Sequence, residues 1–320
     1  MKTKVYVTDD RYGDYSIEQE ILAEVDAEIV VCDLHDPATA KTTLAKADAI
    51  LLNLFDMNAD IIASLKNCRV ISRYGVGIDN VDVTAATKAG IWVARVPSYC
   101  VDEVAVHTIG LLLSAIRRIP VRDRSVRAGA WNLQNTQKVH RMAGRRLGII
   151  GFGAVGREVY KRLSTFQLAE TLVYDPSKDP DFVREAGAEP VPLKTLLQES
   201  DYVTIHAPLS EATTGLIDRE KLALMKPGAI LVNTARGKIV NQADLVEALQ
   251  EGRLAYAALD VMDTEPPAAD DPILTLDNII LTDHCAYYSE QSISELKAKT
   301  AYNVLEVLKG RSPVYPVNAV

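Results

Sequence analysis

Short apolar runs alternate with amphipathic segments along most of the chain. The runs are apolar on both faces, as is typical of parallel strands that are covered by helices on both sides. Up to about residue 95 the pattern predicts one α/β unit, with strands at 4–8, 28–33, 49–54, 69–73 and 91–94. Helices are predicted at 37–47, 59–65 and 84–88 and from Ser16, where Gln19 completes a capping-box pattern.

A long helix is predicted next, because apolar residues recur at spacings of three and four between Val104 and Ile119. Asp102 and Glu103 fall in its first turn, and Pro120 follows its expected end. The alternation then resumes, with strands at 146–150, 171–174, 202–205, 230–233, 256–260 and 279–282. Helices are predicted at 156–164, 193–199, 244–251 and 289–309. The chain is thus expected to be α/β, with two doubly wound parallel-sheet modules.

Length and charge limit the kinds of partner. At 320 residues, two domains are the expected number. The 35 basic and 43 acidic residues give a formal net charge of −8. Nucleic acids and anionic membranes attract clustered Lys and Arg, so this charge argues against both as main partners. The basic stretch at 122–127 is interrupted by Asp123, and we interpret it as the solvated face of a helix.

The sequence contains no evident export or membrane signal. The longest apolar stretches, at 49–52 and 109–113, are far shorter than the ~18 residues of a membrane span. Residues 1–10 lack the apolar core of a signal peptide. The cysteines are scattered without a Cys-x-x-Cys pair, at Cys32, Cys68, Cys100 and Cys285. We therefore expect reduced thiols in a cytoplasmic protein.

The strongest chemical signal is the segment Gly-Phe-Gly-Ala-Val-Gly at 151–156. It follows a predicted strand and opens a helix, which is the context that a dinucleotide-binding fingerprint requires. Gly151 permits the tight turn, Gly153 lets a pyrophosphate approach the backbone, and Gly156 lets the helix pack on its strand. The helix N-terminus attracts phosphates, and Arg157 would add positive charge. The alternative is that the glycines serve packing alone.

An acidic residue lies where such a fingerprint needs one. Asp175 ends the next predicted strand, 19 residues beyond Gly156. A carboxylate at this position accepts hydrogen bonds from the adenosine ribose hydroxyls and repels a 2′-phosphate. No Arg stands beside it, since Pro176 and Ser177 follow. The pattern therefore favours NAD over NADP.

Three further residues suggest a reaction centre, because each follows the carboxyl end of a predicted strand, where open parallel sheets bind ligands. They are Arg236, Glu265 and His284. In hydride transfer to a ketone, negative charge grows on oxygen, and a protonated His284 is suited to donate a proton there. Glu265 would fix the imidazole tautomer and favour its protonated form, while Arg236 would hold a carboxylate and polarise the carbonyl. Taken singly, each has a plain alternative as a surface or loop residue.

Several segments resemble the D-isomer-specific 2-hydroxyacid dehydrogenases over nearly the whole chain. The resemblance lies in 73–82, the glycine fingerprint, 206–209, 233–237, 260–266 and the region of His284. Residues 288–291 are most similar to the C-terminal-binding protein branch, and D-3-phosphoglycerate dehydrogenases are similar too. The resemblance implies the roles given above for Arg236, Glu265 and His284. It also implies cofactor contacts from Val155, Gly156, Asp175, Ala207, Thr234, Ala235 and Asp260, the last facing the nicotinamide amide.

The same resemblance implies a substrate site and an architecture. Backbone N–H groups of Val76 and Gly77 would bind the substrate carboxylate, with Arg73 assisting or else forming a structural ion pair. The fold would be two Rossmann- or flavodoxin-like domains with a cleft between them. Residues 1–97 with 288–320 would bind substrate, and 98–287 would bind NAD and pair with a second copy as a homodimer. The helix from Asp102 and the segment with Trp131 would supply dimer contacts, although ordinary packing also explains Trp131.

Two positions depart from the family pattern. Asp283 stands where the family has Pro, and its charge is expected to favour the protonated His284 and to raise the pH optimum. Asp283→Asn should then shift the pH–rate profile to lower pH. Tyr287 stands where the C-terminal-binding protein branch has Trp, which puts that branch's substrate preference in doubt.

Three functions remain open at this point, and no metal site is expected. The first is an NAD-dependent reductase of small 2-oxo acids such as glyoxylate, hydroxypyruvate or pyruvate. The second is an interaction protein in which NAD(H) binding controls assembly with little turnover. The third is a dehydrogenase of a phosphorylated acid, which would need basic residues beyond Arg73 at the pocket. The side chains that choose among acids are expected after the third strand, at Asn53 and Phe55.

Overall fold

The computed structural model describes residues 2–32, 34, 36–132 and 138–320. It divides into two compact units, here called unit 1 (Met1–Tyr99 with Ser289–Val320) and unit 2 (Cys100–Tyr288). The expected domain boundaries differ from these by one or two residues. Each unit has its own parallel sheet, so the prediction of two parallel-sheet α/β domains is confirmed.

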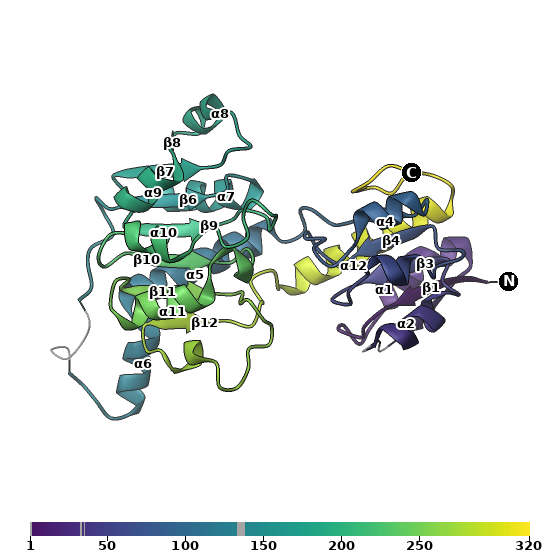
Figure 1. Ribbon diagram of the computed structural model, residues 1–320, viewed down its shortest axis with the longest axis horizontal. Coiled ribbons are helices and arrows are strands. Elements are labelled where there is room, and N and C mark those ends of the chain that lie inside the picture. Colours follow the sequence, from purple (N-terminus) through teal and green to yellow (C-terminus); the bar gives the residue numbers. More distant parts are fainter. Residues whose placement is uncertain (1, 33, 35, 133–137) are drawn as a thin grey trace. The chain divides into compact units, whose positions relative to one another are not determined.

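Unit 1 is built on a five-stranded parallel sheet in the order β2-β1-β3-β4-β5 (Figure 1). Its strands are β1 (Thr3–Val7), β2 (Ala27–Val31), β3 (Ala49–Leu52), β4 (Val70–Arg73) and β5 (Trp92–Ala94). Its helices are α1 (Ser16–Leu22), α2 (Pro37–Leu44), α3 (Ala59–Ile62), α4 (Val83–Lys88) and α12 (Glu290–Leu308), with a 3-10 turn at Ala23–Val25. Every residue of β3 is buried, as expected for a central strand between two helical layers.

The C-terminal part of the chain completes unit 1. Helix α12 contacts β3, β4 and α1, and its Asn303 side chain donates to the carbonyl oxygen of Arg95 at 3.2 Å. Beyond the helix, the Asn318 side chain accepts a hydrogen bond from the N–H of Val93 at 2.7 Å. Segments more than 200 residues apart in sequence therefore share one fold.

The predicted capping box at Ser16 is wrong. Tyr15 occupies the N-cap position of α1, and no side chain caps this helix end. Ser16 is already the first helical residue, so its hydroxyl lies too far along the helix to reach the N3 amide. The hydroxyl instead donates to the Asp14 carboxylate at 2.9 Å.

Unit 2 has a seven-stranded parallel sheet in the order β12-β11-β10-β9-β6-β7-β8. Its strands are β6 (Arg146–Ile150), β7 (Glu170–Tyr174), β8 (Glu189–Pro190), β9 (Tyr202–Ile205), β10 (Ile230–Asn233), β11 (Tyr256–Leu259) and β12 (Ile279–Leu281). The chain runs outward from β6 to β8, returns to β9 on the other side of β6, and then runs outward again to β12. This reversal between β6 and β9 is the place where open α/β sheets bind ligands, outside the carboxyl ends of the strands.

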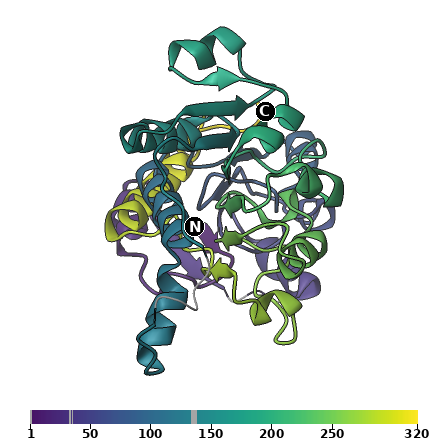
Figure 2. The same cartoon turned by 90° about the vertical axis from the view of Figure 1, so that its left-hand side faces the viewer.

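Helices cover both faces of this sheet (Figure 2). They are α5 (Val101–Arg117), α6 (Ile119–Arg127), α7 (Ala154–Leu163), α8 (Pro180–Glu185), α9 (Leu193–Glu199), α10 (Arg219–Leu224) and α11 (Gln242–Gln250), with 3-10 turns at Ser164–Phe166, Gly237–Ile239 and Pro272–Thr275. Alternate residues of β10 belong to two different hydrophobic clusters. Leu231 joins the cluster with α9, α10 and α11, whereas Ile230 and Val232 join the cluster with α5 and α7. This division explains why the strands are apolar on both faces.

The long helix expected between Val104 and Ile119 is present as α5, but it ends two residues earlier, at Arg117. The chain leaves α5 at Arg118, which adopts a left-handed conformation (φ 57°), and α6 begins directly afterwards. Pro120 therefore lies in the first turn of α6, where its missing N–H costs nothing. No residue of α6 is buried, which confirms that its basic stretch is a solvated helix face.

Among the described residues, no helix taken singly has the length and hydropathy of a membrane span. In the same described ranges, α5 and α6 reach that length and composition together, and they are bent by 60° at the break between them.

Candidate active site

The glycine segment forms a tight loop between β6 and α7. Gly151 has φ +91°, and a Cβ there would lie 2.6 Å from the backbone nitrogen of Ala207. A Cβ at Gly156 would lie 2.2 Å from the carbonyl oxygen of Gly151. Both positions therefore require glycine, because backbone atoms of the loop and of the segment after β9 approach too closely for a side chain. Ala207 lies directly against this loop, as expected for a residue of the cofactor site.

The second glycine of the loop, Gly153, fits a bound pyrophosphate. Gly153 is the N-cap of α7, and no side chain caps the helix there. A Cβ at Gly153 would meet nothing within 4 Å, so this position is not needed for packing. The open space in front of a ten-residue helix with an uncapped N-terminus suits a negatively charged phosphate group. The observed geometry thus fits a dinucleotide better than glycines used for packing alone.

The Asp175 carboxylate lies over the glycine loop. It accepts a hydrogen bond from the N–H of Phe152 at 2.8 Å and another from the Ser177 hydroxyl at 2.7 Å. The loop and the end of β7 are therefore held together at the position expected for the ribose site. Arg157 is exposed, its Nε donates to the carbonyl oxygen of Gly153 at 3.2 Å, and its guanidinium lies 5.5 Å from the ring centre of Phe182.

The segment that carries Arg236 follows β10 and is shaped by Asn233. The Asn233 side chain donates to the carbonyl oxygen of Arg236 at 2.9 Å and accepts from the N–H of Ala235 at 3.0 Å. The Thr234 hydroxyl lies 2.8 Å from that of Thr108 on α5. This bracing role of Asn233 was not predicted from the sequence, although an Asn at the end of a buried strand is a recognisable signal for a turn.

Gly237 brings the Arg236 segment into contact with the segment that carries Glu265. A Cβ at Gly237 would lie 2.0 Å from the carbonyl carbon of Met262. No side chain fits there, so the two segments touch through their backbones.

We expect Gly237→Ala to separate these segments and to lower kcat/KM by about 10²-fold, since a displacement of ~1 Å in a reaction centre costs about that much. The measurement is steady-state kinetics beside thermal unfolding. Gly110→Ala is the matched control, because a Cβ at Gly110 meets nothing within 4 Å. Wild-type kinetics for Gly237→Ala would contradict the expectation.

His284 and Glu265 form a direct pair. The Nδ1 atom of His284 lies 2.6 Å from Oε2 of Glu265, and the other carboxylate oxygen accepts from the N–H of Met262 at 2.9 Å. Burial by itself would raise the pKa of Glu265. The net effect is a lowered pKa, because burial is outweighed by the hydrogen bond to His284, the charge of His284, the Met262 N–H and the charge of Arg236. The three residues predicted as a reaction centre therefore interact through the carboxylate of Glu265.

The turn that carries His284 is organised by the buried side chain of Asp260. The Asp260 carboxylate accepts from the Thr282 hydroxyl at 2.6 Å and from the N–H groups of Cys285 and Ala286 at 3.0 Å each. Its carbonyl oxygen accepts from the N–H of His284 at 2.9 Å. His284 adopts φ 53°, a conformation that non-glycine residues seldom adopt. Asp260 thus holds the imidazole in a left-handed turn, in addition to its expected place beside the nicotinamide.

Loss of the Glu265 carboxylate should lower activity, because Oε2 of Glu265 lies 2.6 Å from Nδ1 of His284 and holds the imidazole in place. In Glu265→Gln we expect kcat for reduction to fall by about 10²-fold, the cost of a displacement of ~1 Å in a reaction centre. Because the pKa of Glu265 is lowered in the folded chain, its stabilising contribution is present above pH 4.5 and is lost as the pH falls further. Steady-state kinetics measure the first effect and thermal unfolding at several pH values the second. Wild-type kcat in Glu265→Gln would refute this role.

Cys285, next to His284, lacks the properties of a nucleophile. Burial, followed by a hydrogen bond to Asp283, raises the pKa of the Cys285 thiol to about 11. Cys285, His107 and Asp260 place one potential metal-ligating atom each within 4.8 Å of one another. The Thr282 hydroxyl already joins His107, at 3.1 Å, to Asp260. We therefore assign this trio to the hydrogen-bond network that supports the His284 turn.

The residues expected to bind a carboxylate lie in unit 1, directly after β4. Gly75 has φ +144°, and a Cβ there would overlap the Arg73 guanidinium, which lies against it. Val76 is 39% exposed. Within the described part of the chain, neither the Val76 nor the Gly77 N–H donates a hydrogen bond. Two adjacent N–H groups after a glycine with positive φ are the arrangement expected to hold an anion, and residues 75–77 are here called the 75–77 nest.

Comparison with known proteins agrees with this geometry. Residues 109–286 match the family model of the D-isomer specific 2-hydroxyacid dehydrogenase, NAD binding domain. The glyoxylate reductase of Korarchaeum cryptofilum is 40% identical over 275 residues, which cover 85% of this chain and 82% of that protein. The D-3-phosphoglycerate dehydrogenase of Archaeoglobus fulgidus is 39% identical over 254 residues, or 79% of this chain, but this chain spans only 48% of that protein.

A solved structure is similar over nearly its full length. The D-lactate dehydrogenase from Aquifex aeolicus, complexed with NAD and lactic acid, superimposes with a TM-score of 0.87 at 29% identity, covering 96% of each chain. The glycine loop, Asp175 and the group formed by Arg236, Glu265 and His284 agree with these similarities. The chain belongs to the D-isomer specific 2-hydroxyacid dehydrogenases, NAD-dependent oxidoreductases that act on the CH–OH group of their donors.

Proposed function

We propose that this chain reduces small 2-oxo acids to D-2-hydroxy acids with NADH, and catalyses the reverse oxidation. The observation that carries the proposal is the 2.6 Å contact between Nδ1 of His284 and Oε2 of Glu265. The positive charge of Arg236 also acts on Glu265 and lowers its pKa. A proton donor and a guanidinium suit a substrate with a carbonyl beside a carboxylate.

NADH, when bound at the glycine loop, would supply the hydride for the carbonyl carbon. His284 donates its Nε2 proton to the carbonyl oxygen, which becomes the hydroxyl group. Glu265 holds the ring through Nδ1 and stabilises the positive charge before the transfer. Arg236 binds the substrate carboxylate and polarises the carbonyl, which lowers the energy of the developing alkoxide. Within unit 1, we assign carboxylate binding to the N–H groups of Val76 and Gly77, with Arg73 beside them.

The same proposal also assigns the residues that would bind the cofactor. The residues that would hold the pyrophosphate lie at the N-terminus of α7, namely Gly151, Gly153, Val155 and Gly156, with Arg157 nearby. Asp175 would accept hydrogen bonds from the ribose hydroxyls and favours NAD, because a 2′-phosphate would face its charge. The residues that would contact the nicotinamide half are Ala207, Thr234, Ala235, Asp260 and His284. We accordingly assign NAD binding to unit 2 and substrate binding to unit 1.

The relatives favour catalysis over NAD(H)-controlled assembly. Those reported above are named glyoxylate reductase, D-3-phosphoglycerate dehydrogenase and D-lactate dehydrogenase. For this chain we propose a short 2-oxo acid such as glyoxylate, hydroxypyruvate or pyruvate.

The test is NADH oxidation, followed by absorbance, against a panel of 2-oxo acids that includes these three and 3-phosphohydroxypyruvate. NADPH is assayed in parallel to test the role of Asp175. We expect turnover with at least one short acid and a preference for NADH. No turnover with any acid would overturn the proposal, and a preference for 3-phosphohydroxypyruvate would replace the substrate class.

We further propose that the chain works as a cytoplasmic homodimer that pairs through unit 2. Large apolar side chains on and near α5 and α6 are exposed, namely Val106 (53%), Ile119 (53%), Val126 (50%) and Trp131 (90%). All four cysteines are free thiols, which suits a reducing compartment. Light scattering after size exclusion should give a dimer, and Ile119→Glu with Trp131→Glu should give monomers. A wild-type monomer would contradict this pairing.

A further inference from the structure

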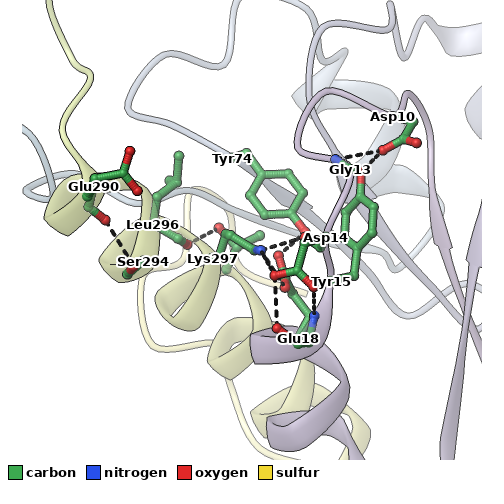
Figure 3. A network of polar contacts seen from close by, with 12 residues as sticks. Asp10, Gly13, Asp14, Tyr15, Glu18, Tyr74, Glu290, Ser294, Leu296 and Lys297 are labelled. Carbon is green, nitrogen blue, oxygen red and sulfur yellow. Dashed lines mark hydrogen bonds and ion pairs between the residues drawn. The ribbon is translucent and has the colours of Figure 1, made fainter.

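Unit 1 contains a network of buried polar side chains that the chemistry above does not use (Figure 3). Its centre is formed by Tyr74 (3% exposed), Glu18 (0%) and Lys297 (4%). These residues come from the end of β4, from α1 and from α12, and Figure 3 shows their side chains pointing toward one another. Asp14 and Tyr15, which precede α1, border the network.

The contacts run from Tyr74 through Glu18 to Lys297. The Tyr74 hydroxyl donates to Oε1 of Glu18 at 2.8 Å. The ammonium of Lys297 lies 3.7 Å from Oε2 of Glu18 and 3.4 Å from the Asp14 carboxylate, and it donates to the Asp14 carbonyl oxygen. It also lies 5.8 Å from the ring centre of Tyr15. A phenol, a carboxylate and an ammonium are therefore joined out of contact with water.

Such a network is a costly way to stabilise a fold. Removing a carboxylate and an ammonium from water carries a desolvation penalty that their attraction often fails to offset, and apolar residues of similar size commonly do as well. Its physical consequence is fixed geometry, because buried polar side chains that are joined to one another have few alternative arrangements. Burial, then the charge of Glu18 and the bond to it, raises the pKa of Tyr74 well above 10, so the phenol remains a hydrogen-bond donor at neutral pH.

The network is connected to the 75–77 nest through Tyr74, which directly precedes Gly75. On the other side of this loop, the Gly75 carbonyl oxygen accepts from the N–H of Val96 at 2.8 Å. The Val76 carbonyl oxygen accepts from the Arg95 guanidinium at 3.4 Å. The loop is thus held at its start by the phenol of Tyr74 and at its carbonyls by residues 95 and 96. Its N–H groups at Val76 and Gly77 remain available to an anion.

We propose that Tyr74 is a positioning residue for the substrate carboxylate, because its bond to Glu18, backed by Lys297, sets the orientation of the 75–77 nest. The inference rests on the proposed function of Val76 and Gly77 in binding that carboxylate. Tyr74 acts through the backbone of the loop that follows it, so it is not itself a catalytic residue.

The main test is Tyr74→Phe, which removes the hydroxyl and keeps the ring that packs edge-on to Tyr12 at 5.2 Å. We expect the KM for the 2-oxo acid to rise about tenfold, because the N–H groups lose their alignment. The KM for NADH should stay within about twofold of wild type, since the glycine loop belongs to unit 2. A merely structural defect would not produce this split between the two KM values.

Two variants serve as controls. Glu18→Gln keeps an acceptor for the Tyr74 hydroxyl, so its KM for the 2-oxo acid should lie closer to wild type than that of Tyr74→Phe. Tyr256→Phe also removes a buried phenol. Tyr256 is the first residue of β11, and its hydroxyl donates to the Asp277 carbonyl oxygen at 3.4 Å. It should leave both KM values unchanged.

Hydrogen–deuterium exchange of the full chain provides a readout that does not depend on turnover. The peptide that spans 74–80 should exchange faster in Tyr74→Phe and stay as in wild type in Tyr256→Phe. An unchanged KM for the 2-oxo acid, or unchanged exchange of this peptide, overturns the inference while the proposed function stands. If the wild-type chain reduces no 2-oxo acid, the proposed function fails, and the exchange rates still decide whether Tyr74 orders the nest.

Discussion

Replacing His284 with alanine is expected to lower kcat for reduction of a 2-oxo acid by about 10²–10⁴-fold, the usual contribution of a positioned general acid. The reason is that the carbonyl oxygen then gains its negative charge without a proton donor. NADH binding should survive, because the glycine loop and Asp175 are untouched and the Asp260 carboxylate keeps its backbone partners. Binding can be measured by the change in NADH fluorescence, apart from turnover.

The matched control is His140→Ala, which removes an exposed histidine outside the site. It should retain wild-type kcat. A His284→Ala variant that keeps more than a tenth of wild-type kcat would show that another group supplies the proton.

Replacing Arg236 with glutamine is expected to lower kcat/KM by about 10²–10³-fold, the cost of losing one preorganised donor to a developing oxyanion. Both kcat and the KM for the 2-oxo acid should change, because Arg236 binds the carboxylate and polarises the carbonyl. Arg236→Lys should recover only part of the loss, since an ammonium keeps the charge but not the planar pair of donors.

The control for this prediction is Arg253→Gln. Arg253 is half-exposed and pairs with Glu251 on the surface at 2.6 Å, so its loss should leave the kinetics unchanged. If Arg236→Lys has wild-type kcat/KM, the guanidinium geometry assigned to Arg236 is wrong.

The larger elements of the fold were predictable because their hydrophobic periods are strong. The strands β6, β9 and β10 and the helix α9 have the predicted bounds. The six-residue helices α8 and α10 were missed. Their signals were local ones, Asp179 before Pro180 in α8 and Asp218 as the N-cap of α10.

The sequence predicted those residues of the site that directly follow the end of a strand. Glycine spacing and strand order located the loop, and they also brought Arg236, Glu265 and His284 to one sheet edge. Contacts between distant segments could not be deduced. The bond from Thr282 to Asp260 joins side chains 22 residues apart, and the bond from Tyr74 to Glu18 joins side chains 56 residues apart. Such pairs depend on packing angles between elements, which the residue pattern of one chain does not encode.

We propose that His284 and Arg236 act on one 2-oxo acid beside NAD. The most direct measurement is a crystal structure of the chain with NAD and oxamate, an unreactive analogue of a 2-oxo acid. We expect Nε2 of His284 within hydrogen-bond distance of the oxamate carbonyl oxygen, and the oxamate carboxylate bound by Arg236. Oxamate bound away from His284, or a cofactor whose pyrophosphate lies away from Gly153, would contradict it.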